Sequence, residues 1–378
     1  PVVTLIGPRQ SGKTTLVRAC FPEHDYANLE NPELRRVAKD DPRQFFALHP
    51  GKLIIDEVQR VPELLSWIQL RVDEDQHPGR YILTGSHQLR LHEAVSQSLA
   101  GRTALLRLWP LSIAELYPEK CVSDKNHLLL QGFLPRVHAE EQDASAAYGN
   151  YFHTYVERDV RQLMEIRNLS LFENFVRLLA GRVGQVINLT SLSGEIGVSS
   201  TTLKEWLSIL EASFVVFRLN PYYRNFGKRL VKSPKYYFVE PGLACWLLGI
   251  ESEHAMARDP LHGNLFENMV VAEAFKTHLN AGHEPHLYFW RDSNHNEVDL
   301  LYERQRRLTP IEIKSAMTWH ASFSRSVKRY RRSFDPVDAG YVIYAGELEP
   351  EDEDFRALHF TKTAKIFVGE DGISNIEH

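Results

Sequence analysis

The residues at the start of the chain have the types and spacing needed to hold a triphosphate. After the apolar run Val2–Ile6, the chain reads G-P-R-Q-S-G-K-T, the P-loop pattern G-x-x-x-x-G-K-T. Glycine permits the tight turn that brings backbone N–H groups to phosphate oxygens, and the helix that follows adds its positive end. We expect Lys13 to contact the β- and γ-phosphates and the Thr14 hydroxyl to bind Mg²⁺. The residues assigned to this loop are Gly7, Gln10, Ser11, Gly12, Lys13, Thr14 and Thr15.

Two acids end a second apolar run, Leu53–Ile55, at Asp56 and Glu57. In a parallel sheet such a strand is apolar on both faces, and its carboxyl end opens toward the ligand crevice. Asp56 is therefore expected to hold Mg²⁺, and Glu57 to orient and deprotonate the attacking water. The alternative is a solvated strand end that leads into a helix.

Polar residues that follow two further strands complete this predicted site. Arg80–Thr84 runs into Gly85 and Ser86, and Ser86 is the candidate that senses the γ-phosphate, with Thr84 as second choice. A turn with capping hydroxyls is the alternative. Arg102 precedes another predicted strand, and is a candidate arginine finger that reaches the γ-phosphate of a neighbouring subunit. An arginine on a solvated loop would look the same.

The last third of the chain places acids and a lysine on neighbouring predicted strands. Side chains two apart share one face of a strand, so Asp299 on one strand can lie beside Glu312 and Lys314 on the next. A predicted helix adds Glu267. Carboxylates this close repel one another unless they share a cation, so the pattern predicts a divalent metal on Glu267, Asp299 and Glu312. The metal would activate water, and Lys314 would position the nucleophile or neutralise the transition state.

The segments GPRQSGKTTL, LIIDEVQRVPEL, YILTGSHQ and SLAGRTALLRLWPLSIAEL resemble the prokaryotic AAA+ ATPase family of predicted ATP-binding proteins. The resemblance covers nearly the whole chain and implies an ASCE-type ATPase. It implies the roles given above for Lys13, Thr14, Asp56, Glu57 and Ser86, and it favours Arg102 as the finger.

In that family a C-terminal domain of unknown function, related to restriction-endonuclease folds, follows the ATPase. GNLFENMV, LYFWRD, EVDLL and PIEIKS match it closely, and the acid–lysine arrangement resembles the PD-(D/E)xK nuclease core. Such a domain either cleaves DNA or serves as a platform for DNA binding or assembly.

The middle of the chain has the pattern of a winged helix. Residues 170–219 read as a helix, a short helix, a glycine turn, a longer helix and a β-branched strand. The longer helix begins with polar residues, which suits DNA contact, but the same module also packs as an AAA+ lid. Tyr222–Lys235 interleaves aromatic and basic residues, as nucleic-acid contacts or a domain-boundary loop would. Four cations line one face of the predicted helix Ser324–Ser333: Arg325, Lys328, Arg329 and Arg332.

Composition bounds these interpretations. A chain of 378 residues predicts two or three domains, and no apolar run is long enough to span a bilayer. Three scattered cysteines favour a reducing cytoplasm. A net charge of −5 requires any nucleic-acid contact to use a local basic patch. The acidic run Glu347–Asp354 is expected to be a solvated loop, and Pro1 suggests that an upstream segment is missing from this numbering.

The predicted fold class is α/β: a P-loop AAA+ three-layer parallel sheet over residues 1–120, a helical and winged-helix region over 121–235, and a restriction-endonuclease-like α/β domain over 236–378. The predicted function is a cytoplasmic, ATP-hydrolysing AAA+ protein that uses ATP and Mg²⁺ and acts on DNA, branched or single-stranded. It would work as a homo-oligomer such as a hexamer, away from membranes, with Mg²⁺-dependent nuclease activity left open. The alternative is a nucleotide-dependent signalling or scaffold switch whose nuclease-like domain is an inactive interaction module.

Overall fold

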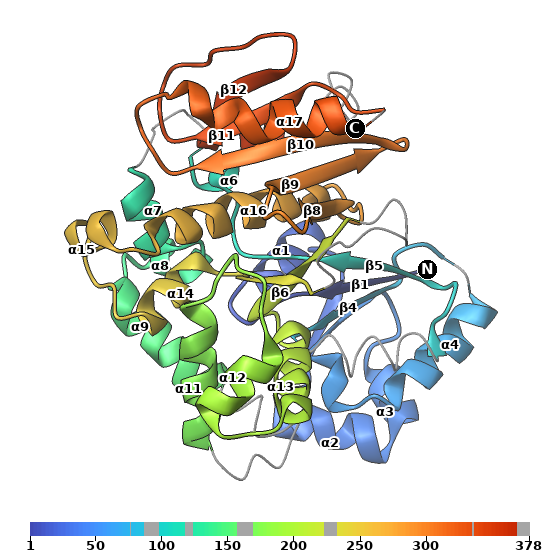
Figure 1. Ribbon diagram of the computed structural model, residues 1–378. Coiled ribbons are helices and arrows are strands. Elements are labelled where there is room, and N and C mark those ends of the chain that lie inside the picture. Colours follow the sequence, from blue (N-terminus) through green and yellow to red (C-terminus); the bar gives the residue numbers. More distant parts are fainter. Residues whose placement is uncertain are drawn as a thin grey trace. The chain divides into compact units, whose positions relative to one another are not determined.

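The structure is a computed structural model that describes residues 1–75, 77–86, 98–117, 124–156, 169–222, 233–334 and 336–368. The chain forms two compact units, one of residues 1–110 with 212–214 and one of residues 111–211 with 215–378 (Figure 1). Both of the later regions predicted from the sequence fall in the second unit, and a domain boundary near residue 235 stays a prediction.

The first unit is built on a parallel five-stranded sheet in the order β2-β3-β4-β1-β5. Its strands are β1 (Val2–Ile6), β2 (Asp25–Asn28), β3 (Leu53–Asp56), β4 (Tyr81–Gly85) and β5 (Thr103–Arg107). Its helices are α1 (Lys13–Cys20), α2 (Pro32–Asp40), α3 (Pro42–Leu48), the short 3₁₀ turn η1 (Val58–Arg60) and α4 (Leu64–Glu74). Every residue of β3 and β4 is buried, as in a parallel sheet that is covered on both faces.

Strand order explains how this sheet builds a site. Because β4 lies between β1 and β3, its carboxyl end lies between the loop that follows β1 and the acids that end β3. The predicted parallel sheet of a P-loop protein is therefore confirmed. The sequence also predicts a helical start at Pro42, since proline favours the first position of a helix. The structure confirms it, because Pro42 opens α3 and the Asp41 side chain accepts a hydrogen bond from Gln44 N.

The second unit is built on a mixed seven-stranded sheet in the order β12-β11-β10-β9-β8-β6-β7. Its strands are β6 (Val216–Pro221), β7 (Lys235–Phe238), β8 (Leu287–Arg291), β9 (Glu297–Arg304), β10 (Arg307–Lys314), β11 (Gly340–Tyr344) and β12 (Phe355–His359). The sequence of residues 365–368 predicts a final strand, and this prediction is wrong. The last strand is β12, and the chain then turns into the 3₁₀ helix η4 (Phe360–Ile366), which buries Phe360 and Thr363.

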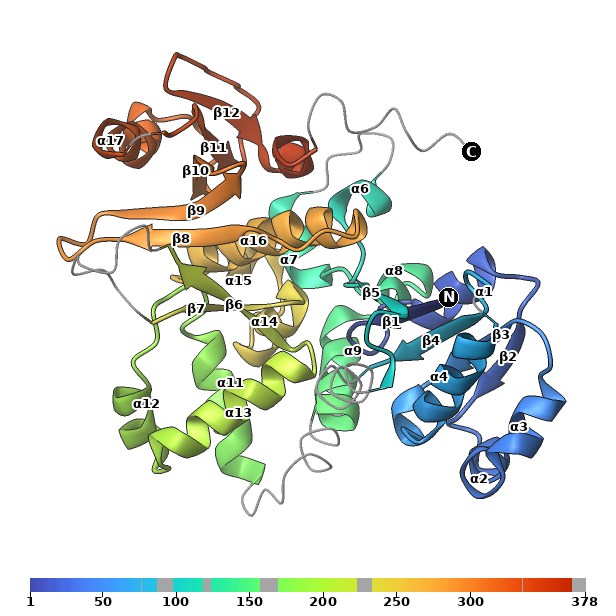
Figure 2. The ribbon, with the colours of Figure 1, turned by 90° about the vertical axis from the view of Figure 1, so that its right-hand side faces the viewer.

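The second unit also contains helices, of which α17 lies beside β10 and β11 in both views (Figures 1 and 2) and α16 contacts β7 and β10. They are α6 (Ile113–Leu116), α7 (Lys125–Gln131), α8 (Pro135–Ala139), α9 (Ala144–Tyr151), the π-helix η2 (Phe152–Val156), α11 (Leu169–Ala180), α12 (Leu189–Ile196), α13 (Ser200–Ala212), α14 (Pro241–Leu247), α15 (Glu253–Arg258), α16 (His262–Asn280), η3 (Ala321–Ser324) and α17 (Arg325–Ser333). Most of α16 is buried, so it is a core helix rather than a surface one. Within the described ranges, no helix has the length and apolar character needed to cross a membrane.

The order α12, α13, β6, β7 follows the predicted sequence of elements. Gly197 ends α12 in the left-handed conformation, and Ser199 caps α13 by accepting a hydrogen bond from Thr202 N at 3.0 Å. The strands β6 and β7 pair antiparallel, and β6 also pairs with β8 through Asn220 and Tyr288. This hairpin is therefore part of the large sheet.

Candidate functional site

The P-loop lies between β1 and α1. Gln10 and Gly12 both have positive φ angles, 62° and 89°, and such left-handed residues build the concave turns in which backbone N–H groups bind anions. An added Cβ on Gly7 would lie 1.9 Å from the carbonyl oxygen of Leu108, so only glycine fits there. Thr15 lies in the first turn of α1. The loop therefore has the backbone shape that its sequence predicts.

Two polar side chains of the loop are buried. The Ser11 hydroxyl has no hydrogen-bond partner among the described residues, and Lys13 Nζ donates to the carbonyl oxygens of Gly7 at 3.0 Å and Pro8 at 2.6 Å. Burial lowers the pKa of Lys13 to about 8, although the nearby Glu57 and Asp56 favour its charge. An unpartnered hydroxyl and a buried cation at a helix N-terminus fit the oxygens of a triphosphate.

Asp56 is surrounded by three hydroxyl groups. Its Oδ2 accepts hydrogen bonds from Thr14 at 2.9 Å and from the Tyr26 hydroxyl at 2.6 Å, and Thr84 donates to Oδ1. Burial, with this bond to Asp56, raises the pKa of Tyr26 well above its usual value. The sequence predicted Thr14 beside Asp56 but missed Tyr26. Local pattern does not place Tyr26, because it reaches Asp56 only through the pairing of β2 with β3, in which Asn28, on the same face as Tyr26, lies opposite Asp56.

Glu57 is held in an unusual conformation by its neighbours. Its φ is 58°, which is uncommon outside glycine, and its N–H donates to Thr84 Oγ1 at 3.4 Å. The Ser86 hydroxyl donates to the Glu57 carboxylate at 3.1 Å, and Gln59 Nε2 donates to the same oxygen. The geometry thus brings Ser86 and Thr84 to the acids, and it adds Gln59, which the sequence analysis missed.

The oxygens of Thr14 and Asp56 suit a magnesium ion. Hydroxyl and carboxylate oxygens are the ligand types that Mg²⁺ takes beside substrate phosphates, and these two lie 2.9 Å apart at the mouth of the P-loop. When bound, the ion supplies positive charge that offsets the charge of the phosphate oxygens.

Arg102 lies away from these residues. Its carbonyl oxygen accepts a hydrogen bond from Val2 N at the first residue of β1, whereas the P-loop follows the last residue of β1, about 13 Å further along the strand. Its guanidinium binds the Asp73 carboxylate at 2.6 and 3.0 Å. The fold therefore does not bring Arg102 to the nucleotide site of its own chain.

A second cluster of charged side chains lies on β9 and β10 of the second unit. Lys314 Nζ pairs with the Glu312 carboxylate and lies 3.8 Å from Asp299 Oδ2. Asp299 also accepts a hydrogen bond from Ile313 N at 2.9 Å, and Ser326 of α17 donates to Glu312. The structure brings Asp299, Glu312 and Lys314 together on neighbouring strands, as the sequence predicts.

Glu267 joins this cluster through Lys235, the last residue of the basic and aromatic stretch Tyr222–Lys235. Lys235 opens β7, is 1% exposed, and its Nζ lies 3.1 Å from Glu267 and 2.5 Å from Glu297. The Tyr237 hydroxyl donates to Glu267 at 2.6 Å. Residues 223–232 of the predicted basic and aromatic stretch lie outside the described residues. Lys235, at the end of that stretch, is buried, and its positive charge lies beside the carboxylates of Glu267 and Glu297.

The expected metal on Glu267, Asp299 and Glu312 does not fit this arrangement. Throughout the described ranges, no group of three or more His, Cys, Asp or Glu side chains could hold a metal ion. Glu267 faces the ammonium of Lys235, while Asp299 and Glu312 face that of Lys314. The positive charge that these acids need is therefore supplied by two lysines.

The cluster should make stability depend on pH. Burial, with the nearby Asp299, raises the pKa of Glu312 to about 8, and burial raises that of Glu267 to about 7 despite Lys235. Both acids hold protons more tightly in the folded chain than when unfolded, so the stability they contribute falls as pH rises from about 4.5 to 8. Denaturant unfolding at pH 5 and at pH 8 would measure this dependence. The free energy of unfolding should fall less between pH 5 and pH 8 for Glu312→Gln than for the natural chain. Equal losses would contradict this assignment.

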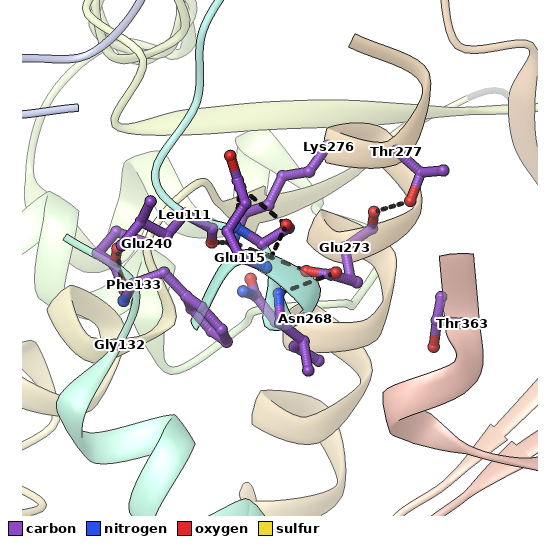
Figure 3. A network of polar contacts seen from close by, with 12 residues as sticks. Leu111, Glu115, Gly132, Phe133, Glu240, Asn268, Glu273, Lys276, Thr277 and Thr363 are labelled. Atoms are coloured by element: carbon purple, nitrogen blue, oxygen red, sulfur yellow. Dashed lines mark hydrogen bonds and ion pairs between the residues drawn. The ribbon is translucent and has the colours of Figure 1, made fainter. Parts of the chain in front are cut away.

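A buried polar network fixes the first residues of the second unit onto α16 (Figure 3). Lys276 Nζ donates to Leu111 O at 2.8 Å and lies 3.8 Å from the centre of the Phe133 ring. Glu273 accepts a hydrogen bond from Ile113 N at 3.0 Å, and Glu240 accepts one from Phe133 N at 2.9 Å. Burial raises the pKa of Glu240 to about 7. Because these groups bind backbone atoms, we interpret the network as structural.

The parallel sheet and the site at its edge define a P-loop ATPase of the AAA class. An AAA domain model matches residues 1–117, and two domains of unknown function, DUF8612 and DUF4143, match residues 123–254 and 262–362. The chain belongs to the family of an uncharacterized Mycobacterium tuberculosis protein, which is 35% identical over 335 residues, 87% of this chain and 73% of that one.

Other similar proteins are more distant. An uncharacterized Haemophilus influenzae protein is 22% identical over 311 residues, which cover 73% of this chain and 74% of that one. The Thermotoga maritima RuvB Holliday junction branch migration motor is 19% identical, with a TM-score of 0.28 over 57% of this chain and 81% of that one. A STAND ATPase with a tetratricopeptide repeat sensor from Pyrococcus horikoshii is 12% identical, with a TM-score of 0.22 over 74% and 45%.

Proposed function

We propose that the protein hydrolyses ATP at the P-loop and acts on DNA. The observation that carries the ATPase part is the placement of Glu57. Ser86 and Gln59 hold its carboxylate, and it follows directly on Asp56, which contacts Thr14. In the proposed reaction a water oxygen attacks the γ-phosphorus, the bond to the β-phosphate oxygen breaks, and Glu57 accepts the proton of the water. Lys13 and the loop N–H groups hold the phosphates, and Ser86 responds to the γ-phosphate through its bond to Glu57.

We further propose that Arg102 acts on a neighbouring subunit. It lies at the far end of β1 from its own P-loop, so only a second copy could present it to a nucleotide. The bond to Asp73 would orient the guanidinium, and an arginine supplied in this way stabilises the transition state. This role requires a homo-oligomer such as a hexamer.

The DNA part of the proposal rests on the second unit. In α17, Arg325 and Arg332 lie two turns apart and have no ion pair among the described residues. The start of α13 exposes Thr201 and Lys204, which is where a winged helix contacts bases. A basic helix and an exposed polar helix start are the features that a protein of net charge −5 needs to bind a phosphate backbone.

The proposal is tested by measuring ATP hydrolysis with duplex, single-stranded and branched DNA. We expect one form of DNA to raise the rate of the natural chain and no form to raise that of Lys13→Ala, because the variant lacks the phosphate-binding cation. A natural-chain rate that no DNA changes would contradict the action on DNA, and hydrolysis that survives in Lys13→Ala would contradict the site.

A second candidate function is favoured by Lys235. A restriction-endonuclease-like domain whose acids are neutralised by lysines would bind DNA or partners without cutting, as a nucleotide-dependent scaffold. In Mg²⁺ or Mn²⁺, we expect no strand cleavage that differs between the natural chain and Asp299→Ala. Cleavage that is lost in Asp299→Ala would restore the nuclease interpretation.

A further inference from the structure

The acidic segment that leads into β12 is the exposed loop that its sequence predicts, and two of its carboxylates also contact α17. Asp352 Oδ2 lies 2.6 Å from Lys328 Nζ of α17. Two residues on, the Asp354 carboxylate pairs with Arg331, and the carbonyl oxygen of Glu353 accepts a hydrogen bond from Arg331 at 2.8 Å. The segment therefore neutralises two of the cations of α17. We name residues 349–354 the acidic strap.

Bonds that do not involve α17 hold the acidic strap in place. Asp352 Oδ1 accepts hydrogen bonds from Asp354 N at 2.8 Å and Phe355 N at 3.2 Å, which form a turn at the start of β12. Glu351 pairs with Arg356 at 3.5 Å, and Glu349 pairs with Lys362 at 2.5 Å. The strap would thus keep its turn if its contacts with α17 were broken.

The cations of α17 line two shallow grooves. One groove of about 580 Å³ is lined by η3 and α17, with four cations: Arg325, Lys328, Arg329 and Arg332. A second groove of about 490 Å³ places Arg331 and Arg332 beside Asp354. In the first groove Arg329 donates to Asn296, which carries no charge, while Lys328 is held by the strap. The face therefore has two cations, Arg325 and Arg332, without an ion pair among the described residues, and a third, Lys328, that is paired with the strap.

We propose that the acidic strap competes with a DNA backbone for α17: it holds Lys328 and Arg331 in the free protein and yields them when phosphates dock along the helix. This inference rests on the proposed action on DNA. A nucleic-acid backbone fits because four cations share one helix face at positions i, i+3, i+4 and i+7, so that positive charge extends over two turns of the helix and suits a linear series of phosphates. The strap carboxylates then occupy positions that phosphates would take.

The strap should weaken DNA binding without preventing it. The side chains of Lys328 and Asp352 are 33% and 39% exposed, and ion pairs of such exposure contribute little to stability. A phosphate can therefore replace the carboxylate at small cost, and removal of one strap carboxylate should strengthen binding by about fivefold at most.

The test compares two variants of the strap that each remove one negative charge. Asp352→Asn frees Lys328 and keeps Oδ1 as an acceptor for the turn, whereas Glu351→Gln changes a pair that does not involve α17. With a short fluorescent DNA duplex and the full chain, we expect Asp352→Asn to raise affinity by about fivefold and Glu351→Gln by less than about twofold. A Lys328→Gln background should abolish the gain from Asp352→Asn.

The outcomes separate this inference from the proposed function. Equal effects of Asp352→Asn and Glu351→Gln on measurable DNA binding would overturn the strap and leave the action on DNA standing. If no duplex, single-stranded or branched DNA binds any of these proteins, the action on DNA and the strap both fail. If polyglutamate binds the natural chain and the duplex does not, the face serves an acidic protein partner, and the inference is overturned.

Discussion

Replacing Glu57 with glutamine is expected to lower kcat for ATP hydrolysis by about 10²- to 10⁴-fold while nucleotide binding persists. The glutamine side chain has the same shape and can keep its contacts with Ser86 and Gln59, but it cannot accept the proton of the attacking water. Phosphate release would measure the rate, and equilibrium binding of a fluorescent ATP analogue would measure affinity.

The matched control is Glu63→Gln, which changes an exposed glutamate six residues further on. It should hydrolyse ATP at the natural rate. Ser86→Ala and Gln59→Ala should give smaller losses than Glu57→Gln, since they leave the base in place and disturb only its orientation. A Glu57→Gln protein as active as the natural chain would remove Glu57 from the mechanism.

Replacing Lys235 with methionine is expected to lower the free energy of unfolding of the second unit by about 3–5 kcal/mol. The substitution leaves Glu267 and Glu297 without their ammonium partner in a site where Lys235 itself is almost fully buried. Urea unfolding would measure the change.

Three comparisons make this prediction specific. Lys314→Met should cost less, because the Lys314 side chain is 36% exposed and water therefore screens its ion pairs more than those of Lys235, which is 1% exposed. Adding Glu267→Gln to Lys235→Met should restore part of the loss. A divalent cation should stabilise Lys235→Met and leave the natural chain unchanged, since the vacated acids would then share an ion. If the cation stabilises the natural chain through these acids, the lysine is not a substitute for a metal.

The nucleotide site was largely predictable because its parts follow one another in the sequence. Lys13 and Thr14 come directly after a strand, and Asp56 and Glu57 directly end one, so local pattern and strand direction were enough to place them. Tyr26 and Gln59 were missed for different reasons. Tyr26 reaches Asp56 only because β2 pairs with β3, and Gln59 turns back to Glu57 through a 3₁₀ turn.

The part of the charged cluster that lies on β9 and β10 was predictable from the sequence, but the contact with Lys235 of β7 was not. The period of a strand places Asp299 and Glu312, which share a hairpin. Lys235 comes from β7, and nothing local to a lysine beside aromatic residues distinguishes a buried counter-charge from a phosphate contact. The contacts between the acidic strap and α17 were missed for the same reason, since the cations lie on a helix about 20 residues earlier.

The pairing of Asn220 with Tyr288 joins positions 68 apart in the chain, and it has a consequence during synthesis. When the β6–β7 hairpin leaves the ribosome, its outer edge has no neighbour, and Lys235 has no carboxylate to meet until α16 and β9 have been made. An uncovered strand edge invites pairing with other chains. Fragments that stop short of β8 should therefore depend on chaperones and aggregate without them.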